Sequence, residues 1–474
     1  MKRCPECRRD YIDNTLLYCL DDGTELLYGP AVSVPDPCGT CSEWPATFRL
    51  MRIYLLLLLA IPLLWLAPPA FAQRSGTPSP YLFVWSGDGD GKDSDFLAVI
   101  DARPNSSSYG EVVATLPVGA NRTYPHHTEY EFPSNSMLFA NGWGAGRTFV
   151  IDLRDPKKPK LAAEFKNVSD YAFPHAFDRL PNGNILATFQ VKTTGFEPPG
   201  ALVELDTRGA LVRASSADVA GMEKKQLWPY SVLALPKIDR VVTSSTEMGL
   251  PKWAQPKAHG ATHESHTLSD TNHLQIWRLS DLKLLATVPL PAPVAGKANL
   301  NPAEPRLLPD GSVYVNTFNC GLFRLSGLDG SEPKAESVYT FPGAGSKEEC
   351  AVPVVIGKYW IQTDPSLPGL IVLDISDPAK PREVSRLVLE DAFRKTHWIA
   401  VDRNSNRIVI TGNNRSWVLI ANIETATGKL TLDPKFKTKG SGRPGIDFDR
   451  PRWPHGETGP AWVHGALFGP KRTK

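Results

Sequence analysis

The sequence predicts an all-β protein, a seven-bladed β-propeller whose two ends pair within one blade. Short apolar, β-branched runs such as 81–86, 184–189 and 407–412 alternate with turn signals, and no long helical period interrupts them. Glycine and proline, at 37 and 43 of 474 residues, require frequent turns. Related segments also recur along the chain, which is the signature of a repeat architecture.

The charge balance excludes one class of partner. Lysine and arginine number 52 against 50 acidic residues, a net charge of +2, and no basic patch with interleaved aromatics stands out. We therefore expect no nucleic-acid partner. A hydrophobic content of 42% excludes a wholly disordered chain.

Residues 1–50 form a cysteine-rich segment. Its two C-x2-C pairs have the spacing of zinc-binding knuckles, in which thiolates supply a tetrahedral site. The stretch CPECRRDYIDNTLLYCLDDGTEL resembles a short zinc-ribbon module found at the front of various bacterial proteins. The alternative is that translation starts at Met51 and that the segment is an upstream extension. The candidate zinc ligands are Cys4, Cys7, Cys19, Cys38 and Cys41.

Residues 51–72 have the pattern of a secretory signal peptide. Arg49 and Arg52 precede the apolar run 53–72, which ends in small residues of the A-x-A type. The run is long enough to span a bilayer, but its three prolines disfavour a continuous membrane helix. A cleaved signal is therefore favoured over a retained anchor. Either one places 73–474 outside the cytoplasm, in the periplasm or secreted, because the arginines hold the leading end inside.

Two kinds of repeat define the blades within 73–474. VIDLRDPKKPKL and VLDISDPAKPRE are near copies, each a strand, a D-P-x-x-P turn and another strand. The second unit is an inner strand, a turn and a second strand. Its six copies span 126–142, 175–189, 230–245, 304–318, 349–364 and 397–412.

A seventh blade is divided between the chain ends. Residues 461–469 resemble an inner strand without partners after it, and 81–118 resemble three outer strands without an inner one. Joining them closes a ring and removes open sheet edges. A ring of six or eight blades, or a pair of sandwiches, is the alternative.

Histidines recur at one position of the repeat. His127, His175 and His397 each lie ten residues before the second strand of their copy, and His464 lies in the inner strand of the divided blade. Inner propeller strands surround a central channel, so we expect these side chains to converge there. Because neighbouring strand residues face opposite ways, the register selects His127 over His126.

Converging neutral imidazoles suit copper, iron or zinc, and four of them without a thiolate argue against a structural zinc site. We therefore predict a metal site in the channel. The alternative is that the histidines fill a wet channel and bind water. Candidate catalytic residues near the same level are Tyr230, Glu304, Glu349 and Cys350.

A second histidine cluster lies in or beside the long loop 248–273, which is expected to be a solvated cover more often than a metal site. It contains His259, His263, His266 and His273, with Glu247 just before it at the expected channel mouth. The two cysteines outside the leading segment, Cys320 and Cys350, could form one disulfide, which the sequence alone leaves open.

A family resemblance rests on motifs in a fixed order. They are FLAVID (96–101), the His-His pair (126–127), TFVIDLRDPKKPKL (148–161), YAFPH (171–175), SSTEM (244–248), HLQIW (273–277), LDISDPAKPR (373–382) and GPAWVH (459–464). In this order they resemble the selenium-binding protein family, whose members include methanethiol oxidases. The resemblance implies a seven-bladed propeller and, as in the bacterial oxidases, copper bound by histidines. The matching histidines are His126 or His127, His175 and His464; His397 rests on the internal register.

The chain departs from the family at one motif. A Cys-x-x-Cys follows the His-His pair in many members, and TEYEFPSNS stands there instead, so selenium binding through that pair is not implied. The expected function is an exported, copper-dependent oxidoreductase that oxidises a small thiol such as methanethiol with O2. The alternatives are a non-catalytic extracytoplasmic binding or scaffold propeller and an iron-dependent oxygenase. A membrane is a partner only if the signal segment is retained.

Overall fold

The computed structural model divides into two compact units, residues 1–72 and 73–474, which we describe separately. It describes residues 76–254, 269–293, 298–346, 349–456 and 459–470, and the backbone of three short strands in the first unit. There, β1 (Lys2–Arg3) pairs with β2 (Asp10–Tyr11) and β3 (Leu27–Tyr28). The five candidate zinc cysteines and the apolar run 53–72 lie outside the described residues.

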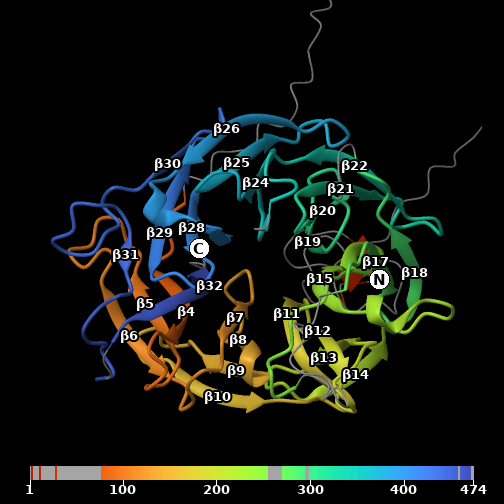
Figure 1. Cartoon of the computed structure of the whole chain (residues 1–474), viewed down its shortest axis with the longest axis horizontal. Coiled ribbons are helices and arrows are strands. Elements are labelled where there is room, and N and C mark those ends of the chain that lie inside the picture. The colour runs from red at the N-terminus through yellow and green to blue at the C-terminus, as the bar shows by residue number, and fades with distance from the viewer. Residues whose placement is uncertain are drawn as a thin grey trace, which may run out of the picture. The chain divides into compact units, whose positions relative to one another are not determined.

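The second unit is a ring of seven antiparallel sheets around a central axis (Figure 1), as predicted. Blades 1 to 3 contain β7 (Pro125–Thr128), β8 (Met137–Gly142), β9 (Arg147–Asp152) and β10 (Lys160–Phe165); β11 (Tyr171–Arg179), β12 (Ile185–Lys192), β13 (Ala201–Leu205) and β14 (Leu211–Ser216); and β15 (Pro229–Leu235), β16 (Arg240–Ser245), β17 (His273–Arg278) and β18 (Leu284–Pro289).

Blades 4 to 6 continue in the same order. They contain β19 (Pro302–Leu307), β20 (Val313–Thr317), β21 (Gly321–Ser326) and β22 (Lys334–Thr340); β23 (Val354–Ile356), β24 (Tyr359–Thr363), β25 (Gly369–Asp374) and β26 (Arg382–Val388); and β27 (Thr396–Val401), β28 (Arg407–Gly412), β29 (Trp417–Ile423) and β30 (Leu430–Leu432), with β31 (Ile446–Asp447) beside β29. Single 3₁₀ turns are η1 (Trp143–Ala145), η2 (Lys224–Gln226), η3 (Pro236–Ile238) and η4 (Asp391–Phe393).

Blade 7 closes the ring with strands from both ends of the second unit. The inner strand β32 (Ala461–Gly469) pairs with β4 (Tyr81–Asp88), which is followed outward by β5 (Phe96–Asp101) and β6 (Val112–Pro117). The predicted closure is therefore confirmed. The D-P-x-x-P turns also lie where the repeats place them, between the third and fourth strands of blades 1 and 5.

The core lies between adjacent blades rather than at the axis. In the contact of blades 7 and 1, the fully buried Trp85 packs edge-on against Phe149, with ring centroids 5.6 Å apart. Trp277 occupies a similar position between blades 2 and 3. Because each blade buries both faces against its neighbours, side chains at the axis are free to be polar.

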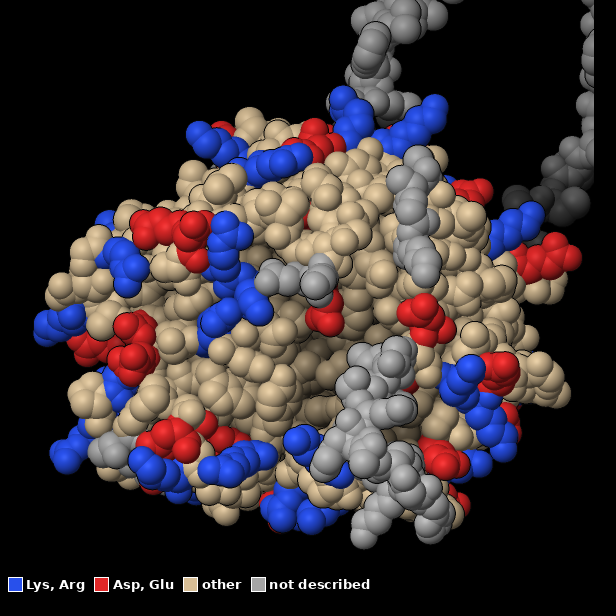
Figure 2. Space-filling model, in the orientation of Figure 1, with Lys and Arg blue, Asp and Glu red and all other residues tan. Residues whose placement is uncertain are grey.

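Two further features frame the channel. Cys320 and Cys350, whose pairing the sequence left open, form a disulfide that joins blade 4 to the chain entering blade 5. Basic and acidic side chains are interspersed around the rim of the face in Figure 2, and this face is hollowed near the centre of the ring.

Among the described residues, no helix has the length and apolar character needed to cross a bilayer.

Candidate metal centre

Five histidines meet at the axis of the ring. They come from four consecutive inner strands around the ring, β27, β32, β7 and β11, and none is more than 6% exposed. The ring centroids of neighbouring members lie 4.2 to 5.1 Å apart. The cluster consists of His126, His127, His175, His397 and His464, and we call it the histidine cluster.

The inner strands carry these side chains at a shared irregularity in their pairing. In six blades the register with the second strand shifts at the same level, and a shift of this kind re-aims the side chains beside it. The paired residues that flank it are Pro125 and Thr128, Pro174 and Phe177, Pro229 and Val232, Pro302 and Pro305, Thr396 and Trp398, and Val463 and Ala466.

The residues within the irregularity occupy equivalent positions in the different blades. The first position is held by His126, His175, Tyr230, Ala303, His397 and His464. The second position, present in five of the blades, is held by His127, Ala176, Ser231, Glu304 and Gly465. A left-handed residue stands two positions before the first in several blades, for example Phe173 at φ 58° and Lys395 at φ 64°. The inner strands of these blades therefore begin with a similar backbone conformation.

The expectation that only one of His126 and His127 faces the channel is wrong. Both rings belong to the cluster, because the register shift interrupts the alternation of side chains that the expectation assumed. The pairing also makes His126, rather than His127, the equivalent of His175 and His397. The prediction counted ten residues back from the start of the second strand. This count selected His127 because the connection between the first two strands is longer in blade 1.

The imidazoles are neutral at physiological pH. Burial lowers the pKa of all five, to about 3 for His175 and about 4 for His397. For His126, His127 and His464 the pKa lies well below its ordinary value, because repulsion between neighbouring imidazolium charges adds to burial. Neutral imidazole is the form that binds a metal ion.

The free nitrogen atoms fit a metal better than a packed core. Within the histidine cluster, the buried nitrogens without a hydrogen-bond partner among the described residues are His126 Nδ1, His127 Nε2, His397 Nε2 and both nitrogens of His464. Nitrogens of His126, His127 and His464 lie within 4.8 Å of one another. Leaving so many buried polar atoms unpaired is costly, and a cation accepting their lone pairs would remove that cost. The donor set therefore fits copper or iron.

The fifth histidine is oriented by the backbone. His175 Nδ1 lies 2.8 Å from the carbonyl oxygen of Tyr230, so it carries the proton and donates it. That leaves His175 Nε2 as an acceptor, 3.1 Å from Nε2 of His126. The ring of Tyr230 covers His175 at a centroid distance of 3.9 Å. The candidate residue Tyr230 thus acts on the cluster through its carbonyl and its ring.

A polar network of side chains lies next to the histidine cluster. The Glu304 carboxylate accepts hydrogen bonds from Tyr130 (2.6 Å) and Ser231 (2.7 Å) and pairs with Arg306 (3.1 Å). The Tyr130 hydroxyl lies 3.5 Å from His127 Nδ1. Sequence reasoning identified Glu304 but missed Tyr130, Ser231 and Arg306. Ser231 and Glu304 occupy the same position of the repeat as His127. This equivalence could have predicted part of the network from the sequence.

Aromatic side chains enclose the cluster. Trp398 packs edge-on against His127 at 5.0 Å and stacks on Tyr130 at 4.9 Å. Trp143 packs edge-on against His175 at 5.6 Å. Neither tryptophan is among the residues predicted from the sequence. Together they make a wall of low polarity around the imidazoles.

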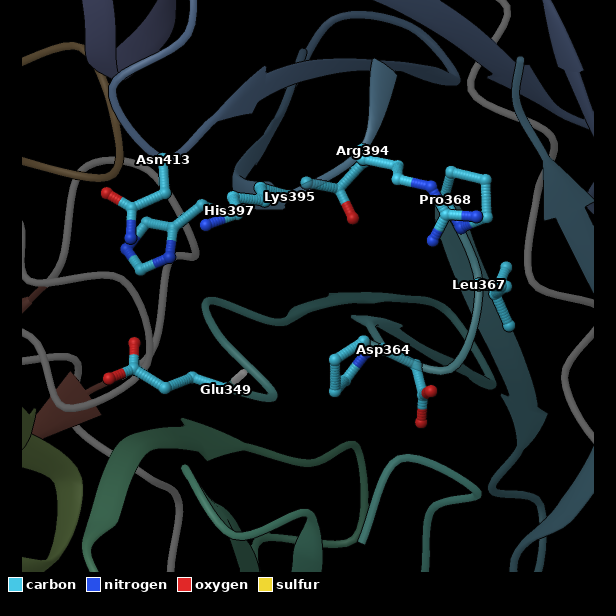
Figure 3. Close-up of a pocket in the computed structure, with 10 residues that line it drawn as sticks. Glu349, Asp364, Leu367, Pro368, Arg394, Lys395, His397 and Asn413 are labelled. Atoms are coloured by element: carbon cyan, nitrogen blue, oxygen red, sulfur yellow. The ribbon is translucent and has the colours of Figure 1, made fainter. Parts of the chain in front are cut away.

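A pocket of about 170 Å³ opens against His397 (Figure 3). Glu349 and Asp364 line one side, and Arg394 and Lys395 line the other. Desolvation of the carboxyl raises the pKa of Glu349, although the residue as a whole is exposed to solvent. Of the predicted catalytic candidates, Glu349 is the one that lines this pocket.

The remaining candidates lie elsewhere. Cys350 is bonded to Cys320 and offers no free thiol in this structure. His273 begins β17, is 1% exposed and is not part of the histidine cluster. Glu247 is buried and accepts a hydrogen bond from the backbone of Ser269. His259, His263 and His266 lie outside the described residues.

The sequence matches the model of the 56kDa selenium binding protein (SBP56) family over residues 68–408. Curated relatives include methanethiol oxidase from Hyphomicrobium sp., 26% identical over 64% of this chain and 69% of the relative. Selenium-binding protein 1 from Arabidopsis thaliana is 26% identical over 63% of this chain and 60% of the relative. For selenium-binding protein 3 from the same plant, the chain spans half of the relative's length.

Solved structures share the arrangement of blades. A hypothetical selenium-binding protein from Sulfolobus tokodaii superimposes with a TM-score of 0.64 at 17% identity, covering 84% of this chain and 95% of the other. The periplasmic gluconolactonase of Pseudomonas aeruginosa gives a TM-score of 0.54 at 13% identity, covering 74% and 94%. At these identities the structures establish the fold alone.

Proposed function

We propose that this chain, which belongs to the 56kDa selenium binding protein family, is a metal-dependent oxidoreductase that oxidises a small thiol such as methanethiol with O2. Methanethiol oxidases among its relatives support the reaction class. Copper is the metal we favour, with iron as the alternative. The observation that carries the proposal is the group of five buried imidazoles at the axis, four of which have a nitrogen without a hydrogen-bond partner.

The residues of this chain would each have a defined part. His126, His127 and His464 would hold the metal with their clustered nitrogens, flanked by His175 and His397. A bound copper ion would supply thiol activation, by lowering the thiol pKa, and a redox partner for O2.

The surroundings of the site would favour the same chemistry. Tyr130 and Glu304 position His127 from the network, since the hydroxyl lies between the carboxylate and Nδ1. Trp398 and Trp143 limit water around the reacting centre.

We also propose that the propeller works outside the cytoplasm. The basic residues, the apolar run and the small-residue end of 49–72 support an export signal. A non-catalytic binding propeller remains the competing function, favoured by the missing Cys-x-x-Cys after the His-His pair.

Metal analysis of the purified protein tests the proposal. We expect about one copper ion per chain after expression in a medium containing both copper and iron, and loss of most of it in the His126→Ala/His464→Ala double variant, which removes two of the three histidines whose nitrogens cluster. His273→Ala removes a buried histidine outside the cluster and should keep the metal. Full retention of metal by the double variant would overturn the assignment.

Oxygen consumption with methanethiol then tests the reaction. A wild-type protein that holds metal and consumes O2 with methanethiol supports the oxidase. A protein that is metal-free from such a medium supports the binding propeller instead.

A further inference from the structure

Aromatic rings cover two members of the histidine cluster. Trp398 packs edge-on against His127 at a centroid distance of 5.0 Å. Tyr230 covers the ring of His175 at 3.9 Å, and Trp143 packs edge-on against it at 5.6 Å. Both imidazoles are fully buried. These rings therefore block the approach of a small molecule to the cluster past His127 and His175.

His397 differs from these two members. It is 6% exposed, the highest value in the cluster, and its Nε2 is buried without a hydrogen-bond partner. Among the described residues its one ring neighbour is His464, at a centroid distance of 4.6 Å. On another side His397 lines the pocket of about 170 Å³. His397 is therefore the member of the cluster that a small molecule entering the pocket would meet first.

The pocket is a preformed opening between blades 5 and 6. Its inner end is bounded by Asn413, which lies beside His397, and by Glu349 across from them (Figure 3). The backbone N–H of Asn413 donates to the carbonyl of Lys395 (2.8 Å), and the hydroxyl of Thr396 donates to the carbonyl of Gly369 (3.0 Å). These bonds tie the start of β27 to the end of β28 and to blade 5, so the walls are fixed before any ligand arrives.

We propose that this pocket is the entrance to the histidine cluster, and that its size restricts the substrate to small thiols. The inference rests on the proposed function for the identity of the substrate. An apolar cavity of about 150 Å³ holds a benzene molecule, so a thiol of that size or smaller can enter whole, whereas the tripeptide thiol glutathione is too large. Selection by size rather than by charge follows because Arg394 is already paired with Asp391 (3.0 Å) and Glu349 is exposed to solvent.

Alkylation of the metal-free protein tests the route without metal or thiol. Iodoacetamide is a small neutral reagent that alkylates neutral imidazole. By mass spectrometry of the digested protein, we expect His397 to be alkylated at least about tenfold faster than His127 and His175. Alkylation of His127 or His175 before His397 would overturn the inference, because the reagent would then have entered from another side.

Two variants fill the inner end of the pocket from opposite walls. Asn413→Phe and Glu349→Phe should each slow the alkylation of His397 at least about tenfold, because entry would require the new ring to move aside. Glu349 is exposed, so the fold should tolerate the larger side chain there. Two controls should leave the rate unchanged: Glu349→Gln, which keeps the size of the side chain, and Val388→Phe, at a 65% exposed position of β26. An unchanged rate in both filling variants would overturn the inference.

Copper uptake extends the test from His397 to the whole cluster. Copper bound beside Trp398 should quench its fluorescence, so uptake can be followed by stopped-flow fluorescence. We expect Asn413→Phe and Glu349→Phe to bind as much copper as the wild type at equilibrium, but at least about tenfold more slowly. Uptake at the wild-type rate in both variants would show that the metal enters elsewhere and would contradict the proposed route.

Oxygen consumption separates the two proposals. The wild type should consume O2 with methanethiol but not with glutathione, and equal rates with the two thiols would overturn the size limit. If methanethiol is oxidised and both filling variants are alkylated and oxidise it as fast as the wild type, the entrance fails and the oxidase stands. If the filling variants protect His397 but no thiol is oxidised, the proposed reaction fails and the entrance stands.

Discussion

At the scale of single residues, the buried ion pair beside the histidine cluster should be the most sensitive contact. Glu304 is 1% exposed and its carboxylate lies 3.1 Å from Arg306. Removing one member of a buried pair leaves the other charge uncompensated, at a cost of about 3–5 kcal/mol. We therefore expect Arg306→Met to lower the free energy of unfolding by about 3 kcal/mol in urea titrations. Glu304→Gln/Arg306→Met, which removes both charges, should recover most of the loss; an equal loss in both variants would contradict the coupling.

Some residues of the histidine cluster and of its polar network could be predicted from the sequence, and others could not. His175 and His397 were identifiable because the repeats align them, and His464 because it lies in the inner strand of the divided blade; the fold places all three in the histidine cluster. Tyr130 and Arg306 were not, because their direction depends on a register shift in the inner strand. Such a shift is decided by pairing with the next strand, which a single segment does not encode.

At the scale of elements, a polar clasp joins the start of β4 to blade 6. Asp402 accepts hydrogen bonds from the backbone and hydroxyl of Ser79, and Arg407 donates to the carbonyls of Ser79 and Ala102. The Arg407 guanidinium lies 2.8 Å from the Asp402 carboxylate, and Asp402 is fully buried. Burial alone would raise the pKa of Asp402, but Arg407 and the hydrogen bonds outweigh it and lower that pKa.

The clasp should make stability depend on pH in one direction. A carboxyl whose pKa is lower in the folded state stabilises the fold above its unfolded pKa, about 3.9, and loses that contribution as the pH falls through the folded value. We expect Asp402→Asn to cost about 2–4 kcal/mol at pH 7 and progressively less below pH 4. Asp310→Asn, in a partly exposed pair, should cost under about 1 kcal/mol. A difference between Asp402→Asn and wild type that stays constant from pH 7 to pH 3 would refute this account.

At the scale of the whole molecule, the number of blades could be predicted because each repeat must bury both faces against a neighbour. Six internal copies and two incomplete ends leave a ring as the arrangement without open edges. The pocket beside His397 could not be predicted in this way. Its walls come from the entry to blade 5, the connection after β24 and the turn before β27, and the packing of the neighbouring blades 5 and 6 brings them face to face.

Closure by β32 gives a prediction that separates the fold from the site. This strand supplies buried side chains such as Leu467 to the contact between blades, and it carries His464. A chain ending at residue 460 should therefore lose its cooperative unfolding transition and its near-ultraviolet circular dichroism, because β4 is left as an unpaired, apolar edge. Co-expression of a segment spanning 459–470 should restore both, by adding the missing strand. The same segment with His464→Ala should restore the fold but bind metal less tightly than wild type. A truncated chain that unfolds cooperatively on its own would show that the ring does not depend on this strand.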